Sequence, residues 1–303
     1  MMQLEGIYAP VPTPFYGDES LHLDAFQENL EKWERSPIDG VVVCGSNGEL
    51  PFLNPHERAL LTRTAKSVFE KKRSGKRIVS GTYMNTTQDT ITCCKACGDS
   101  GADAVLLLPP HYFKGQGMKA AAAFYERVAD ASPVPVVLYN MPGNTGVNLD
   151  ASAILQVAAH PNIIGIKDTS GDMAKLCHLI FESPADFSVF SGSANYFLPA
   201  LALGAKGGTL AAANLYPVAC RTLYDLYREN RKEEAQALQH RLLLASEAVT
   251  GKFGIPGLKA AMDRAGLFGG PVRSPLLPLT SEEEAKLFAI LDAADLDAGE
   301  TWR

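Results

Sequence analysis

The sequence lacks the features that mark several specialised classes of protein. Its 303 residues include only six cysteines and two tryptophans, and so few cysteines in so long a chain do not build a disulfide framework. No apolar run reaches the ~20 residues that a bilayer-spanning helix needs, so we expect no membrane span. The net charge is −6 and no basic stripe stands out, which argues against a nucleic-acid partner.

The first fifteen residues, MMQLEGIYAPVPTPF, are rich in proline and contain no long apolar core. A secretory or transit segment would show such a core or an arginine-rich amphipathic pattern. We therefore predict a cytoplasmic protein, and an organelle matrix also fits the sequence. No metal-ligand spacing appears among the histidines, so neither a metal nor a cofactor is expected.

Three of the cysteines cluster in CCKAC, residues 93–97. A Cys-x-x-Cys spacing suggests a zinc or redox site, but no second pair follows it. The segment also lies within a predicted helix. The favoured interpretation is a set of small, buried helix residues, with metal or redox chemistry as the alternative.

The chain repeats a strand-then-helix pattern. Most of the strand-like runs are continuously apolar, as in parallel sheets that are covered on both faces. The predicted strands are 6–11, 40–45, 77–82, 104–109, 135–140, 163–167, 187–192 and 207–210. Eight strands alternating with helices favour an α/β fold, a (β/α)8 TIM barrel, over an open doubly wound sheet. The glycine-rich phosphate turn of an open sheet is poorly matched by GSNGE, residues 45–49.

Helical periodicity is clear in 20–36 and in 54–72, which opens with Asn54 and Glu57 in the spacing of a capping box. After residue 216 only helices are predicted, over 217–229, 231–250, 256–266 and 280–295. We therefore divide the chain into a barrel, 1–216, and a C-terminal helical extension packed on it, 217–303.

Active sites of such barrels lie at the carboxyl ends of the strands. The predicted ends are rich in hydroxyl and amide groups, and the side chains found there include Ser46, Asn47, Tyr112, Tyr139, Asn144, Lys167, Thr169 and Ser193. Gly192, Gly208 and Thr209 belong to the same predicted substrate site. His111 also lies at this mouth, where we expect it to be a bystander.

Lys167 is the one amine at this mouth, directly after the apolar run from Ile163 to Ile166. Burial there disfavours the ammonium ion and favours the free amine. A free amine attacks a ketone to form a Schiff base, which stabilises the carbanion that an aldolase generates. Tyr139, one strand away, is placed to move protons. The alternative is a structural ion pair between Lys167 and Asp168 or another carboxylate.

Ser46 and Asn47 follow a buried strand and stand in a glycine-containing turn. Short polar side chains and backbone N–H groups in such a turn suit a small carboxylate. A plain turn without a ligand is the alternative.

Several motifs in a fixed order now identify a family. They are PVPTPF (10–15), GSNGE (45–49), LLPPHYF (107–113), VVLYNMPGNTG (136–146), GIKDTSGD (165–172), FSGSAN (190–195) and LGAKGGTLAAANLYP (203–217). With them the chain resembles the dihydrodipicolinate synthase / N-acetylneuraminate lyase family of Schiff-base aldolases. The resemblance implies a barrel and a reaction in which pyruvate is one partner and an aldehyde the other.

The resemblance also implies roles for single residues. Lys167 would be the Schiff-base lysine and Tyr139 the catalytic tyrosine, while Ser46 and Asn47 would hold the pyruvoyl carboxylate. Tyr112 corresponds to a tyrosine that reaches into a neighbouring subunit's site, in a family that is usually a homotetramer built as a dimer of dimers.

Two departures concern the substrate. Dihydrodipicolinate synthases carry Thr-Thr where this chain has Ser46 and Asn47, and an arginine for the second substrate's carboxylate where it has Asn144. Losing that guanidinium fork disfavours such a substrate. The chain is more similar to 4-hydroxy-2-oxoglutarate aldolases, which yield pyruvate and glyoxylate. An aldolase or dehydratase for 2-keto-3-deoxy sugar acids, and a non-catalytic barrel that binds 2-oxo acids, are the competing interpretations.

Overall fold

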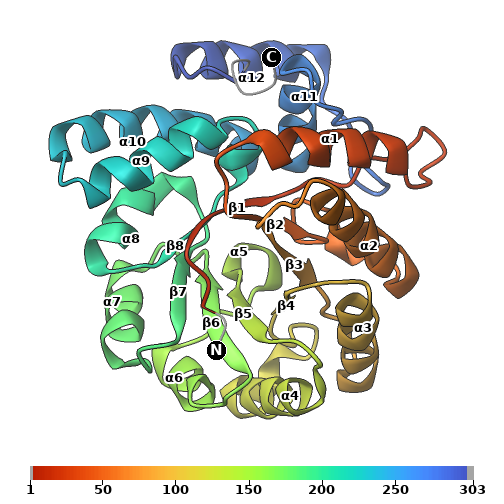
Figure 1. Cartoon of the computed structure of the whole chain (residues 1–303), viewed down its shortest axis with the longest axis vertical. Helices are drawn as coiled ribbons and strands as arrows, with labels where there is room; N and C mark the ends of the chain where they lie inside the picture. The colour runs from red at the N-terminus through yellow and green to blue at the C-terminus, as the bar shows by residue number, and fades with distance from the viewer. Residues whose placement is uncertain (1–2, 299–303) are drawn as a thin grey trace.

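The computed structural model describes residues 3–298 and shows a closed parallel barrel surrounded by helices (Figure 1). The strands follow one another around the barrel in chain order, and β1 pairs with β8 to close it. They are β1 Gly6–Pro10, β2 Gly40–Val43, β3 Arg77–Gly81, β4 Ala104–Leu107, β5 Val136–Asn140, β6 Ile163–Asp168, β7 Ser188–Ser191 and β8 Gly207–Thr209. The predicted TIM barrel and all eight of its strands are confirmed, with ends shifted by one or two residues.

Closure of the barrel depends on a close backbone approach. Gly207 on β8 pairs with Gly6 on β1, and a Cβ atom on Gly207 would lie 2.0 Å from the Gly6 carbonyl oxygen. Only glycine fits at this position, which explains why the last strand begins with Gly207.

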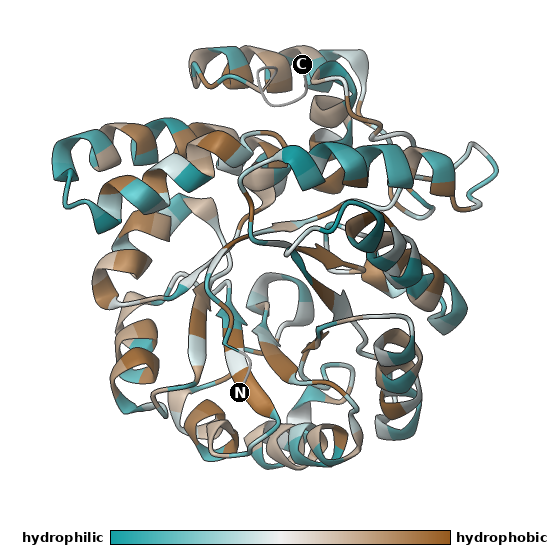
Figure 2. Ribbon diagram, in the orientation of Figure 1, coloured by the Kyte–Doolittle hydropathy of each residue, from teal (hydrophilic) through white to brown (hydrophobic). Residues whose placement is uncertain are grey.

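Helices cover the outside of the barrel. Their bounds are α1 Leu23–Arg35, α2 Pro55–Lys71, α3 Thr87–Asp99, α4 Gly117–Ala131, α5 Pro142–Thr145, α6 Ala151–Ala158, α7 Met173–Glu182, α8 Phe197–Leu203, α9 Pro217–Arg228, α10 Lys232–Ser246, α11 Gly254–Arg264 and α12 Ser281–Ala293. Figure 2 shows mostly apolar strands inside the ring and surrounding helices that mix hydrophilic and hydrophobic residues. The predicted capping box is present at α2, where the Asn54 side chain accepts from the Glu57 amide and Glu57 accepts from the Asn54 amide.

Helices α9–α12 lie along one side of the barrel, next to α8 and α1 (Figure 1). One apolar cluster runs from the barrel through α1 into these helices and includes Ile7, Trp33, Leu223 and Leu258. The C-terminal helices therefore share a core with the barrel strands that they flank.

The helix predicted over 231–250 is wrong at its C-terminal end. Helix α10 stops at Ser246, and Glu247–Lys252 form a π-helical turn, η5. The Thr250 hydroxyl bonds back to the Ser246 carbonyl, and Gly254 follows with a φ of +58°. Side-chain bonding to the backbone and a left-handed glycine both disrupt the α-helical ladder, while the apolar spacing of this segment still has a helical period.

Three cysteines of the CCKAC segment, Cys93, Cys94 and Cys97, are fully buried on helix α3. This confirms the prediction of small buried helix residues. Within residues 3–298, no group of three histidine, cysteine or acidic side chains is arranged to hold a metal ion. No helix in the same range is long and apolar enough to cross a membrane.

Candidate active site

Lys167 lies in β6 and pairs in register with Tyr139 on β5. Its side chain is 4% exposed, and its Nζ lies 4.2 Å from the centre of the Tyr139 ring. Asp168 does not pair with it, since the Asp168 carboxylate binds Lys175 Nζ at 2.8 Å. Among the described residues Lys167 Nζ forms no hydrogen bond and no ion pair. The alternative of a structural Lys167–Asp168 pair is therefore wrong.

Tyr139 connects the amine to the loop after β2. Its hydroxyl lies 3.2 Å from the Ser46 hydroxyl. The loop turns sharply because Cys44 and Glu49 both take positive φ values, +54° and +59°. Asn47 follows Ser46 and has a buried Nδ2 that finds no hydrogen-bond partner within residues 3–298. A buried donor without a partner is costly, so this atom is suited to an incoming carboxylate oxygen.

A cavity of about 400 Å³ opens above these groups. This volume suits a small oxo acid. The cavity is lined by eight of the predicted site residues, Ser46, Asn47, Tyr139, Asn144, Lys167, Thr169, Gly192 and Ser193. They come from the ends of β5 and β6 and from the loops after β2, β5, β6 and β7, so the carboxyl end of the barrel brings them together.

Gly192 has no room for a side chain. A Cβ atom there would lie 2.2 Å from Thr169 Cγ2 and 2.6 Å from the Asp168 carbonyl oxygen. The Thr169 hydroxyl in turn donates to the Asn140 carbonyl at 2.7 Å. Glycine at this position lets the loop after β7 close against the end of β6, next to Lys167.

Three predicted site residues lie outside this cavity. Gly208 and Thr209 are buried in β8, and Thr209 lines a small space inside the barrel beneath Lys167. Tyr112 is 81% exposed and forms an edge-to-face pair with Phe113 at the surface. Nothing within the described chain brings Tyr112 to Lys167.

The C-terminal segment supplies a wall that the sequence interpretation missed. The end of α10, the π-helical turn and the start of α11 line the cavity with Ser246, Val249, Thr250, Gly251 and Ile255. π-helical turns often occur at functional sites. The sequence signal was the pair of glycines, Gly251 and Gly254, inside an otherwise helical pattern.

The cavity has a single basic side chain in its described lining. Of the residues between 3 and 298 that line it, Lys167 is the only one with an ionisable amine or guanidinium, and none is acidic. The rest of the polar wall consists of hydroxyl and amide groups. Such a site can hold one anionic group near the amine and neutral polar groups farther out.

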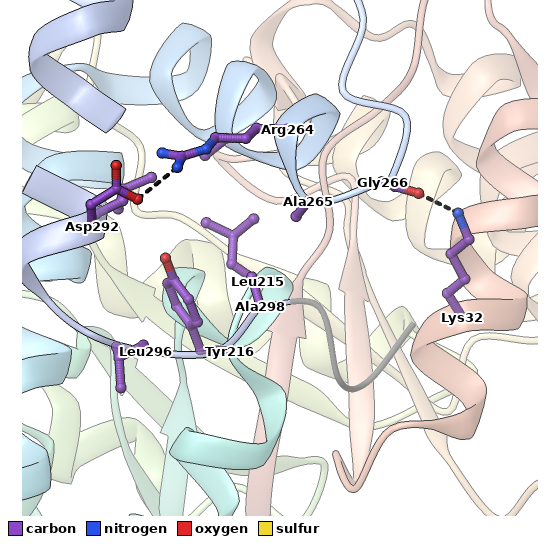
Figure 3. A pocket seen from close by; sticks show the side chains of 11 residues that line it. Lys32, Leu215, Tyr216, Arg264, Ala265, Gly266, Asp292, Leu296 and Ala298 are labelled. Carbon is purple, nitrogen blue, oxygen red and sulfur yellow. Dashed lines mark hydrogen bonds and ion pairs between the residues drawn. The ribbon is translucent and has the colours of Figure 1, made fainter. Parts of the chain in front are cut away.

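A cavity of about 480 Å³ lies elsewhere, between α1, α11 and α12 (Figure 3). Its cations already have partners, because Lys32 donates to the Gly266 carbonyl and Arg264 binds Asp292 at 2.6 Å. It contains no unpaired amine comparable to Lys167, so the chemistry is placed at the barrel mouth.

Comparison with known proteins gives a consistent result. The model of the dihydrodipicolinate synthetase family matches residues 3–294. A probable mitochondrial 4-hydroxy-2-oxoglutarate aldolase of Emericella nidulans is 35% identical over 93% of this chain and 92% of its own length. A 4-hydroxy-tetrahydrodipicolinate synthase of Methanoculleus marisnigri is 34% identical over 93% and 95%. A prophage protein of E. coli K12 from the dihydrodipicolinic acid synthase family, solved in complex with pyruvate, is 27% identical over 97% of this chain and 99% of its own, with a TM-score of 0.89.

Proposed function

Because the chain belongs to the dihydrodipicolinate synthetase family, we propose that it is a class I lyase that forms a Schiff base between Lys167 and a 2-oxo acid. The observation that carries this is the buried amine of Lys167, 4% exposed and without an acidic partner in the described chain. Pyruvate in complex with the E. coli relative supports the substrate class.

The proposed reaction cleaves 4-hydroxy-2-oxoglutarate into pyruvate and glyoxylate. The Lys167 amine attacks the C2 ketone, the resulting carbinolamine hydroxyl takes up one proton from solvent and leaves as water, and a protonated imine remains. Tyr139 then takes the proton of the C4 hydroxyl, the C3–C4 bond breaks, and its electron pair moves into the enamine. Glyoxylate leaves, the enamine gains a proton at C3, and water hydrolyses the imine to release pyruvate.

Ser46 and Asn47 would assist these steps. Ser46 lies 3.2 Å from the Tyr139 hydroxyl and provides the next hydroxyl for the proton. The unpartnered Asn47 Nδ2 would donate to the C1 carboxylate, so that the ketone faces Lys167.

Substrate choice rests on two observations. The first is the 35% identity to the probable 4-hydroxy-2-oxoglutarate aldolase. The second is Asn144 in the cavity wall, where an amide replaces the arginine expected of a dihydrodipicolinate synthase. A second carboxylate would then bind hydroxyl and amide donors instead of a fixed cation.

The same neutral wall favours one competitor. Thr169, Ser193 and Thr250 line the cavity, and several hydroxyl groups suit a polyhydroxy aldehyde. A 2-keto-3-deoxy sugar acid aldolase or dehydratase is therefore the second candidate.

A cleavage assay tests these proposals directly. 4-Hydroxy-2-oxoglutarate, 2-keto-3-deoxygluconate and N-acetylneuraminate would be offered separately, and aspartate semialdehyde would be offered together with pyruvate. Glyoxylate release with the highest kcat/KM supports the first candidate. Loss of water without an aldehyde product would indicate a dehydratase. Binding of pyruvate without turnover of any compound would indicate a non-catalytic barrel.

We also propose that the protein assembles as a homotetramer in which Tyr112 approaches a neighbouring subunit. The exposed pair Tyr112 and Phe113 would gain apolar contacts there. A second cavity of about 370 Å³, lined mostly by apolar residues such as Leu50 and Leu53, adjoins the active site and shares Ser46 with it. It offers a surface that such aromatic side chains can fill.

A further inference from the structure

The residue after Lys167 is a fully buried carboxylate. Side chains alternate between the two faces of a strand. Lys167 accordingly lines the active-site cavity, whereas Asp168 contacts Lys175 on helix α7. Asp168 is 0% exposed. Besides the contact with Lys175, its carboxylate accepts three hydrogen bonds, from Asn140 Nδ2 at 2.8 Å, from the Ser170 amide at 2.7 Å and from the Ser170 hydroxyl.

Lys175 is buried as well, with a side chain 6% exposed. Its Nζ lies 2.8 Å from Asp168 Oδ2 and 2.8 Å from the side-chain oxygen of Asn148. Asn140 connects the same atoms, since its Nδ2 donates to both Asn148 and Asp168. We call these four residues, Asp168, Lys175, Asn140 and Asn148, the Asp168 brace.

The brace lies one residue beyond the reacting groups on both strands. Tyr139 is in register with Lys167, and Asn140 is in register with Asp168. The cross-strand bond from Asn140 to Asp168 therefore fixes the ends of β5 and β6 against each other. This holds the Lys167 amine over the Tyr139 ring.

The brace also determines the charge next to the amine. Three phenols face this part of the barrel: Tyr139 lies against the Lys167 amine, the Tyr196 hydroxyl donates to the Asp168 carbonyl, and Tyr8 lines the small space beneath Lys167. Burial raises the pKa of Tyr196 and of Tyr8, so both are neutral near pH 7. The fixed charges beside Lys167 are thus the Asp168 carboxylate and the Lys175 ammonium, and these cancel.

We propose that Lys175 is a positioning residue for Schiff-base formation, because it neutralises the buried Asp168 carboxylate, so that no net charge stands behind the strand end that carries Lys167. This inference rests on the proposed function. Without Lys175, the uncompensated carboxylate would favour the Lys167 ammonium. Without Asp168, the remaining Lys175 cation would disfavour it.

The test measures imine formation with pyruvate in the full chain as a function of pH, by borohydride trapping and mass spectrometry. Lys175→Met should slow trapping at pH 7 about tenfold and move the acid side of the pH profile to higher pH. Asp168→Asn should move it to lower pH. The double variant, Asp168→Asn with Lys175→Met, should return towards the parent profile.

Lys76→Met is the matched control. Lys76 is a half-buried lysine whose Nζ donates to the Ser36 and Ile38 carbonyls. It lies just before β3, at the opposite end of the barrel. Its removal should leave the pH profile of trapping unchanged. A purely structural brace would lower trapping in every variant without opposite shifts, and that result would overturn the inference. If Lys175→Met does not fold, Asp168→Asn alone tests the inference. A shift of the acid side of its pH profile to lower pH would support it, and an unshifted profile would overturn it. Absence of an adduct in the parent protein would instead refute the proposed function.

Discussion

At the scale of single residues, replacing Lys167 should affect the proposed reaction without lowering the stability of the fold. A buried amine without a hydrogen bond or ion pair in the described chain does not stabilise the fold, because its desolvation is not offset by a partner. We expect Lys167→Met to abolish the pyruvate adduct and to reduce cleavage by at least about 10³-fold. The melting temperature should stay equal or rise.

Trapping with borohydride and a thermal melt of the same sample measure both effects. Lys206, exposed next to the start of β8, is the control, and Lys206→Met should retain the adduct. An adduct that persists in Lys167→Met would place the Schiff base on another lysine.

The Tyr139 hydroxyl has a different role. In Tyr139→Phe the Lys167 amine remains in place, so imine formation should continue. Proton transfer at the C4 hydroxyl should slow by about 10²–10⁴-fold. Ser46→Ala, which removes the group 3.2 Å from that hydroxyl, should cause a smaller loss. Single-turnover cleavage measured beside adduct formation distinguishes the two steps, and a parent rate in Tyr139→Phe would contradict the assignment to Tyr139.

At the scale of elements, the C-terminal helices are tied to the loop after β2 by a buried ion pair. Lys259 on α11 binds Glu49 at 2.6 Å, and the two side chains are 1% and 0% exposed. Glu49 also accepts from the Arg273 amide. Because Glu49 closes the turn that holds Ser46 and Asn47, this pair joins α11 to the active site.

Breaking this pair should be strongly destabilising. Removing one partner of a buried pair leaves an uncompensated charge and costs about 3–5 kcal/mol. Lys259→Met should therefore lower the melting temperature markedly, whereas the double variant with Glu49→Gln should recover part of the loss. Lys286→Met, which breaks an exposed pair with Glu282, should change it little. If Lys259→Met and Lys286→Met lowered the melting temperature equally, the buried pair would contribute no more to stability than the exposed one.

The elements also show how far the sequence predicts this structure. The eight strands were predictable because parallel strands covered on both faces are apolar throughout, and Lys167 stood out as a charge directly after one of them. The turn at Glu247–Lys252 was not predictable from periodicity, since one extra residue in a helix barely changes the apolar spacing. Without that turn, the contribution of Ser246 and Thr250 to the cavity could not be foreseen either.

The partner of Asp168 was also beyond the sequence. Lys175 follows seven residues later on a helix, and nothing in the spacing says that its side chain folds back under the strand end. Several lysines and carboxylates could have paired in principle. Only the three-dimensional packing of α7 against β6 selects Lys175 and leaves Lys167 unpaired.

At the scale of the whole molecule, the loop after β4 presents two aromatic side chains to solvent. Tyr112 and Phe113 are 81% and 77% exposed. Large adjacent apolar groups at a surface often mark a contact between proteins, and here they accompany an apolar cavity that adjoins the active site. We therefore expect this loop to lie in the interface of the proposed homotetramer.

Phe113→Glu places a charge in that interface, where its burial without a partner would be costly. The expected result is a smaller particle by light scattering, with activity that depends on protein concentration because dissociated subunits lose the approach of a neighbour's Tyr112. Phe181, an aromatic residue on α7 that is 89% exposed, provides the control, and Phe181→Glu should leave the mass unchanged. An unchanged mass for Phe113→Glu would exclude this loop from the interface, and a monomeric parent protein with full activity would show that the site is complete within one chain.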